Sequence, residues 1–184
     1  MFRRILFLLA VPFAAVIAFS AAASANVAPG TFTPTAGSFN PANAPGSSHL
    51  ASGTVACTVA ANLDVTCNPF VLGGVGHTNA DVALNASYSA TIDCFNAGTN
   101  KNNPVESHTT TFSAGSSATV TSTKNGQLSV PAQSVSAFSA PQVCPNPNWT
   151  PKIRAGTLAL NSFTYTLTFA GFSSPYITIA ATDP

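Results

Sequence analysis

The chain has 184 residues, of which 46% are hydrophobic and only 6% are charged. Ordinary soluble domains carry about 25% charged residues, so Ser, Thr, Asn and Gln must wet most of this surface. So few cations offer little electrostatic attraction for phosphate, which argues against nucleic acid and anionic membranes as partners. The length suits one folded domain.

The first 25 residues have the pattern of a cleaved export signal. Arg3 and Arg4 precede an apolar run over residues 5–19, and Ala23-Ser24-Ala25 supplies a small-x-small cleavage site. We expect cleavage before Asn26, no transmembrane segment after it, and a secreted or cell-surface protein. The remainder is then divided into a Pro/Ala/Gly-rich segment, residues 26–48, and a β-sandwich domain, residues 49–184.

Four cysteines follow the leader, and an even number in an exported chain indicates two disulfides. They are Cys57, Cys67, Cys94 and Cys144. A hairpin is predicted from residues 53–60 and 63–72, and Cys57 and Cys67 lie equally far from Asn62 at its turn. Symmetric pairing sets these two opposite each other. We therefore favour Cys57–Cys67 with Cys94–Cys144 among the three possible connectivities. A zinc site would need closely spaced Cys pairs or nearby His, which the chain does not offer.

Residues 82–94 carry the clearest strand pattern. Every even position from Val82 to Cys94 is apolar, and the odd positions are mostly Asn, Ser, Thr or Asp. This period of two predicts a strand with one buried and one wet face. Thirteen residues is long for one strand, so we expect a bend or bulge within it.

Two strands are expected next, near residues 105–113 and 116–123. Lys124-Asn125-Gly126-Gln127 then predicts a hairpin with a type I′ turn, because Asn-Gly tolerates positive φ. The return strand runs from residue 128 to 135, and Pro131 indicates an edge or an irregularity. Residues 139–152 contain four prolines and are expected to lack regular structure.

The last predicted hairpin joins residues 163–169, which alternate strictly, to a strand over 176–181. Leu158 and Leu160 have the opposite phase, which predicts a bulge near Asn161-Ser162. Eight or nine strands are expected, with no helix after the leader. The pattern predicts an all-β, disulfide-linked β-sandwich with Ig-like or jelly-roll topology.

Candidate chemistry is sparse. Glu106 and His108 share a face of a predicted strand and could form half of a metal site, but the sequence offers no third ligand. Glycosidases need two carboxylates around the scissile bond, and nothing singles out a pair among the five carboxylate side chains. No nucleophile, cofactor or metal motif is recognised, so we expect no cofactor and a non-enzymatic protein.

Trp149 is the candidate ligand contact, because sugar-binding modules often stack a pyranose on an exposed aromatic ring. Asn146, Asn148 and Thr150 lie beside it and could supply polar contacts. The alternative is a Trp packed near the Cys144 bridge. Thr residues at 164, 166 and 168, extended by Thr178, predict an outward ladder; such arrays can bind ice or crystalline polymer, although Thr is also an ordinary residue of a wet strand face.

The chain resembles a group of small exported bacterial proteins, chiefly actinobacterial, over roughly residues 55–170. The resemblance rests on Val65-Thr66-Cys67-Asn68, the glycine-rich turn at residues 72–76, the alternating strand ending at Cys94, Lys124-Asn125-Gly126, and residues 144–151, which read CPNPNWTP. It implies an exported β-domain with a disulfide at Cys144. It transfers no catalytic residues.

These observations predict a secreted, non-enzymatic extracellular or cell-envelope protein that acts through surface contacts. Envelope or matrix polymers, or polysaccharide, are the expected partners. The alternative function is a carbohydrate-binding module that uses Trp149 and the Asn-rich loops. A small hydrolase or an inhibitor is a weaker alternative.

Overall fold

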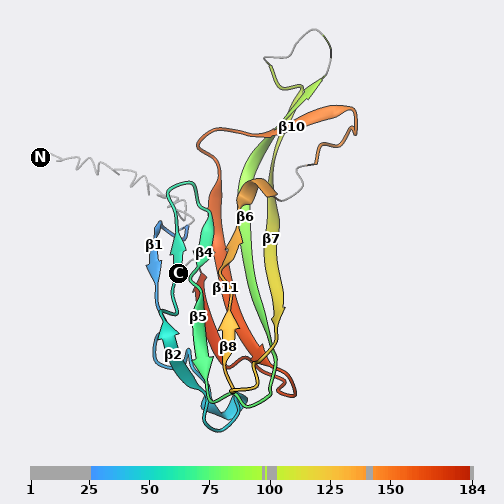
Figure 1. The fold of residues 1–184 in the computed structure, drawn as a ribbon. Helices are drawn as coiled ribbons and strands as arrows, with labels where there is room; N and C mark the ends of the chain where they lie inside the picture. Colours follow the sequence, from blue (N-terminus) through green and yellow to red (C-terminus); the bar gives the residue numbers. More distant parts are fainter. Residues whose placement is uncertain (1–25, 97, 99–102, 140–142, 183–184) are drawn as a thin grey trace, which may run out of the picture.

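The computed structural model describes residues 26–96, 98, 103–139 and 143–182, and the predicted leader lies outside these residues (Figure 1). The described part is all-β, as expected. Its strands are β1 Gly30–Phe32, β2 His49–Gly53, β3 Cys57–Val59, β4 Val65–Cys67, β5 Phe70–Gly73, β6 Ala80–Asn96, β7 Glu106–Val120, β8 Leu128–Val130, β9 Gln133–Val135, β10 Trp149–Ile153, β11 Ala159–Phe169 and β12 Ile177–Thr182. Two short 3-10 helices, η1 Pro41–Asn43 and η2 Ala137–Ser139, complete it. Within the described ranges, no helix is both long and apolar enough to cross a bilayer.

One layer of the sandwich is a five-stranded antiparallel sheet centred on β6. On one side, residues 80–94 of β6 pair with β7. On the other side, residues 80–89 of β6 pair with β11 and residues 92–96 pair with β10. β12 lies beyond β11. The end of the β6–β7 pair projects past the rest of the molecule (Figure 1).

The second layer consists of two small sheets, β1-β3-β4-β9 and β2-β5-β8. Successive strands β2 and β3, β4 and β5, and β8 and β9 each fall in different sheets, so the strands predicted over residues 63–72 and 128–135 are each broken into two. Pro69 and Pro131 stand at two of these breaks, where a residue without an N–H interrupts a ladder. Twelve strands are described where eight or nine were expected, because two predicted strands are split, two others merge in β7, and β1, β2 and β10 fall outside the predicted set.

The core between the layers is built from the predicted inward face of β6. The even positions from Ala80 to Cys94 are all buried, which confirms the period-two pattern. Tyr88, Tyr165 and Phe163 are among the largest fully buried side chains. Burying such aromatic residues contributes on the order of 2–3 kcal/mol each to the hydrophobic stabilisation.

The long hairpin differs from expectation in its second strand. β7 runs unbroken through residues 113–116, and its pairing with β6 has one continuous register from Ala80↔Val120 to Cys94↔Glu106. The predicted break in β7 and the predicted bulge in β6 are therefore wrong as far as this ladder is concerned. At Gly115, a side chain would bring its Cβ within 2.8 Å of Asn85 Oδ1, so glycine relieves crowding rather than ending the strand.

The Asn-Gly turn forms, but it does not make the predicted hairpin. Gly126 has a φ of 70°, and the Thr123 N–H donates to Gln127 O at 2.7 Å. Leu63 is the non-glycine residue with positive φ among the described residues, so Asn125 does not have the type I′ conformation. β8 pairs with β5 in the other layer. Asn125-Gly126 determines where the chain reverses, whereas the pairing of β8 with β5 depends on packing between the layers.

The C-terminal hairpin is confirmed, with Thr166 opposite Thr178. The predicted bulge is also present, because the β11–β6 register shifts between Leu160 and Ser162. Residues 139–152 are less irregular than expected, since β10 begins at Trp149. β10 pairs only with β6 within the described residues, and Pro151 is tolerated because it lies in an edge strand.

Both predicted disulfides are present. Cys57 pairs with Cys67 across the β3–β4 ladder, in which these residues are direct partners. Cys94 at the end of β6 pairs with Cys144 in the connection that precedes β10. The two bridges therefore tie together different parts of the fold.

The N-terminal segment packs along the sandwich. β1 pairs with β3, and the Val27 N–H donates to Leu160 O at 2.8 Å. The Phe32 ring meets Phe163 edge to face, with 5.1 Å between ring centroids. This contact joins the segment to the core.

Candidate functional site

A small second core lies at the projecting end of the long hairpin. Ala90, Ile92 and Cys94 of β6 are buried there, against Cys144, Trp149 and Ile153 among others. The Cys94–Cys144 bridge holds the incoming connection against this end. The disulfide and the ring of Trp149 therefore stabilise the same part of the molecule.

The predicted ligand contacts lie along one turn and the start of β10. Trp149 is half-buried and packs on the second core. Asn146 Oδ1 accepts a hydrogen bond from the Asn148 N–H at 2.9 Å, and the Trp149 N–H donates to Asn146 O at 3.0 Å. Asn148 and Thr150 are exposed. The Asn146 side chain thus holds the turn that presents Trp149, and ligand contact by these four residues stays a prediction.

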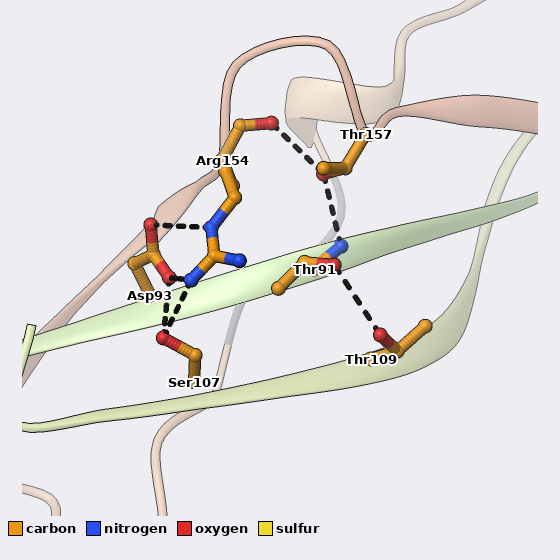
Figure 2. A network of polar contacts seen from close by, with 6 residues as sticks. All are labelled: Thr91, Asp93, Ser107, Thr109, Arg154 and Thr157. Carbon is orange, nitrogen blue, oxygen red and sulfur yellow. Dashed lines mark hydrogen bonds and ion pairs between the residues drawn. The ribbon is translucent and has the colours of Figure 1, made fainter.

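A polar network ties β10 to the long hairpin on the opposite face of the sheet (Figure 2). Arg154 Nε donates to Asp93 Oδ2 at 3.1 Å, and Arg154 Nη2 donates to Asp93 Oδ1 at 2.7 Å. Ser107 Oγ donates to Asp93 Oδ1 at 2.6 Å and accepts from Arg154 Nη2 at 2.9 Å. The hydrogen bonds from Arg154, then that from Ser107, hold the pKa of Asp93 below its usual range.

The same network fixes the loop between β10 and β11 (Figure 2). The Thr91 N–H donates to Thr157 Oγ1 at 3.0 Å, and Thr157 Oγ1 donates to Arg154 O at 2.8 Å. Thr91 Oγ1 lies 3.3 Å from Thr109 Oγ1 on β7. The loop that begins at Arg154 is therefore held by side chains from both neighbouring strands.

This loop forms one wall of a groove of about 300 Å³. The other walls are the β3–β4 turn at Asn62 and Leu63, and Phe138 of η2. The Phe138 side chain is 67% exposed. The pattern in the sequence did not point to Phe138 or Leu63, because their exposure and position depend on where the loops meet.

Leu63 has an unusual backbone at this groove. Its φ is 67°, which costs a non-glycine residue on the order of 1–2 kcal/mol. The buried Tyr88 hydroxyl donates to Leu63 O at 3.1 Å and helps to hold that conformation. Burial, followed by the nearby Asp64 charge, raises the pKa of Tyr88 to about 12.

Glu106 and His108 share the inward side of β7, as expected. Their register partners on β6 are Cys94 and Ile92. His108 Nδ1 is buried and has no hydrogen-bond partner within the described residues. No cluster of three His, Cys, Asp or Glu side chains suited to a metal ion occurs in the described ranges.

The outward face of the five-stranded sheet carries small neutral side chains in register across β7, β6, β11 and β12. We call three of its rows the hydroxyl face. In strand order they are Ser117–Ala83–Thr166–Thr178, Gly115–Asn85–Thr164–Ala180, and Ser113–Ser87–Ser162–Thr182. None of these residues is buried. The face includes Thr164, Thr166 and Thr178 of the predicted Thr ladder, whereas Thr168 lies in the next row, beside the exposed Asp81 of β6.

The hydroxyl face is regular because its strands are regular. Adjacent strands lie about 4.8 Å apart, and outward residues repeat about every 6.8 Å along a strand. No side chain in the three rows is larger than Asn. A shallow hollow of about 300 Å³, lined by residues 35–38 with Thr178 and Ala180, borders the face at β12.

Comparisons of the chain with protein-family models, with curated proteins and with solved structures found no match. The resemblance to exported actinobacterial proteins therefore stays an expectation. The candidate sites rest on geometry alone.

Proposed function

We propose that this chain is an exported, non-enzymatic protein that binds a neutral extracellular or cell-envelope polymer through its hydroxyl face. The observation that carries the proposal is the register of the three rows over four strands. A regular array of this kind fits a repeating ligand better than a single small molecule. Many weak contacts to one polymer add together.

The chemistry of the face favours a polysaccharide as that polymer. Each Ser and Thr hydroxyl can donate and accept, as sugar hydroxyls do. Such short side chains also lose less rotamer entropy on binding than Lys, Arg or Gln would. Because the three rows carry no charge, binding should change little with ionic strength.

Three carboxylates, those of Asp93, Asp81 and Asp64, have structural partners, which supports a non-catalytic role for them. Asp93 is held by Arg154. Asp81 accepts from Thr119 Oγ1 at 2.7 Å, and Asp64 accepts from Asn62 Nδ2 at 2.7 Å. These bonds link neighbouring strands or close a turn.

Export is the first part of the proposal to test. A host that exports the chain should yield a product that begins at Asn26, and its intact mass should show this. The physical reason is the small residues at 23 and 25, which fit the peptidase site. A product that stays in the cytoplasm with residues 1–25 attached would contradict export.

Retention of the exported protein on microcrystalline cellulose and on chitin tests the contact surface. Thr164→Glu places a charge in the centre of the hydroxyl face and should reduce retention about tenfold or more. Thr58→Glu is the matched control, because Thr58 is an exposed Thr on the outer side of β3 in the other layer. Equal retention of both variants and the parent protein would contradict the hydroxyl face as the contact surface.

The second candidate function is binding of one sugar ring. The groove beside Phe138 supports it, because the ring is exposed at a groove whose volume lies at the lower end of that of ligand pockets. Phe138→Ala and Trp149→Ala should be tested on soluble oligosaccharides by titration calorimetry. Loss of binding in one of these variants, with Thr164→Glu unaffected, would favour this alternative.

A further inference from the structure

We propose that the free edge of β7 pairs with β7 of a second copy of this chain, antiparallel, to form a symmetric dimer. This inference goes beyond the contact with a polymer. It starts from the backbone, because an edge strand leaves alternate N–H and C=O groups without a ladder partner. β7 spans residues 106–120 and pairs only with β6 within the described part of the chain.

The opposite edge of the same sheet, β12, has a partner segment. Residues 38–40 cover β12, with an isolated bridge between Phe39 and Ile177. The Asn40 N–H donates to Tyr176 O, and the Thr178 N–H donates to Ser38 O, both at 2.8 Å. The N-terminal segment thus pairs with the beginning of the β12 edge, around Ile177. Among the described residues, no segment does the same for β7.

β7 also lacks most of the features that usually prevent edge pairing; the exception is Glu106, a charged residue on the inward side at its first position. Natural edges are protected by Lys, Pro, bulges or shortness. β7 has no Lys or Pro, keeps one register with β6 over its whole length, and is fifteen residues long. Its exposed outward side chains are Ser, Thr and Gly. β7, which runs along the outer side of the molecule in Figure 1, therefore offers an edge with which another strand can pair.

Charge and symmetry favour a second copy as the occupant. Antiparallel pairing of one strand with its copy gives a two-fold interface, in which each residue contacts the same patch on the other chain. With Ser113, the middle residue of β7, opposite itself, Glu106 faces Val120 and His108 faces Ala118. No like charges oppose each other. The hydroxyl faces of the two copies would then continue across the joined edge.

Three measurements test this dimer on protein purified after export. Sedimentation equilibrium should give a concentration-dependent dimer, and hydrogen exchange by NMR should show alternate β7 amides that become protected as concentration rises. Ser113→Cys should form an intermolecular disulfide under oxidising conditions. A monomer up to about 1 mM, with those amides unprotected, would overturn the proposal.

A charge variant separates this interface from other self-association. Ser113→Lys brings two lysines together at the two-fold axis and should weaken the dimer on the order of tenfold, with partial recovery at high salt. Thr58→Lys adds the same charge to the outer side of the other layer and should leave dimerisation unchanged. A dimer that Ser113→Lys does not weaken, or that Thr58→Lys weakens equally, is inconsistent with pairing through β7.

Discussion

Arg154, just after β10, donates two hydrogen bonds to the carboxylate of Asp93 on β6, the shorter at 2.7 Å. These bonds join two residues that are 61 positions apart in the chain. They also lower the pKa of Asp93. Protonation of Asp93 at low pH should therefore weaken the attachment of β10 to β6.

The first prediction concerns acid stability. A carboxyl whose folded pKa is depressed stabilises the fold above its unfolded pKa of about 3.9, and that stabilisation is lost as pH falls through the folded pKa. In Asp93→Asn and in Arg154→Gln, the free energy of unfolding should therefore decrease less steeply below about pH 4 than in the parent protein. Urea unfolding at pH 2–6 would measure it. Lys152→Gln is the control, because Lys152 lies over the Phe95 ring, 5.1 Å from Nζ to the centroid; an equal effect there would contradict a specific pair.

The second prediction concerns alkaline unfolding. The chain has three tyrosines, and burial raises the pKa of Tyr88, Tyr165 and Tyr176. A raised folded pKa gives stability that is present below the unfolded pKa of about 10 and is lost as pH rises above it. Absorbance at 295 nm and circular dichroism should therefore change together between about pH 10 and 12. Full ionisation near pH 10 with an intact fold would be inconsistent with this burial.

The third prediction compares two buried hydroxyls. Tyr165 Oη is buried and has no hydrogen-bond partner within the described residues, whereas Tyr88 Oη donates to Leu63 O. Tyr165→Phe should be neutral or stabilising by up to about 1 kcal/mol, and Tyr88→Phe should destabilise by about 1 kcal/mol. Urea unfolding of both variants measures the difference. The opposite ranking would mean that Tyr165 has a partner.

The fourth prediction concerns the order of disulfide reduction. Cys57 and Cys67 are 0% and 1% exposed, whereas Cys144 is partly exposed. Mild reductant should open Cys94–Cys144 first and should cost about 4 kcal/mol of stability, because that bridge closes the longer loop. Alkylation of the freed thiols and mass spectrometry would identify them. Simultaneous release of all four thiols would indicate that reduction requires global unfolding.

The sites differ in how far local pattern could find them. The Thr residues of β11 were visible as outward positions, since strict alternation decides which side each residue faces. The rows that cross to Ser113 and Ser117 were not visible, because they depend on strands that meet only after folding. Phe138 and Leu63 gave no signal, because the groove that they line is formed by three separate loops.

Local chemistry determined the elements of this protein. Alternation decided the inward face of β6, equal spacing around Asn62 paired Cys57 with Cys67, and opposite phases located the bulge after Leu160. Tertiary packing decided the strand partners: β8 crosses to β5 after the Asn-Gly turn, β10 joins β6, and β7 stays unbroken and, among the described residues, pairs on one side only. The reason is that a side chain's direction is set by its own backbone, whereas the partner of a strand is set by contacts between residues far apart in the chain.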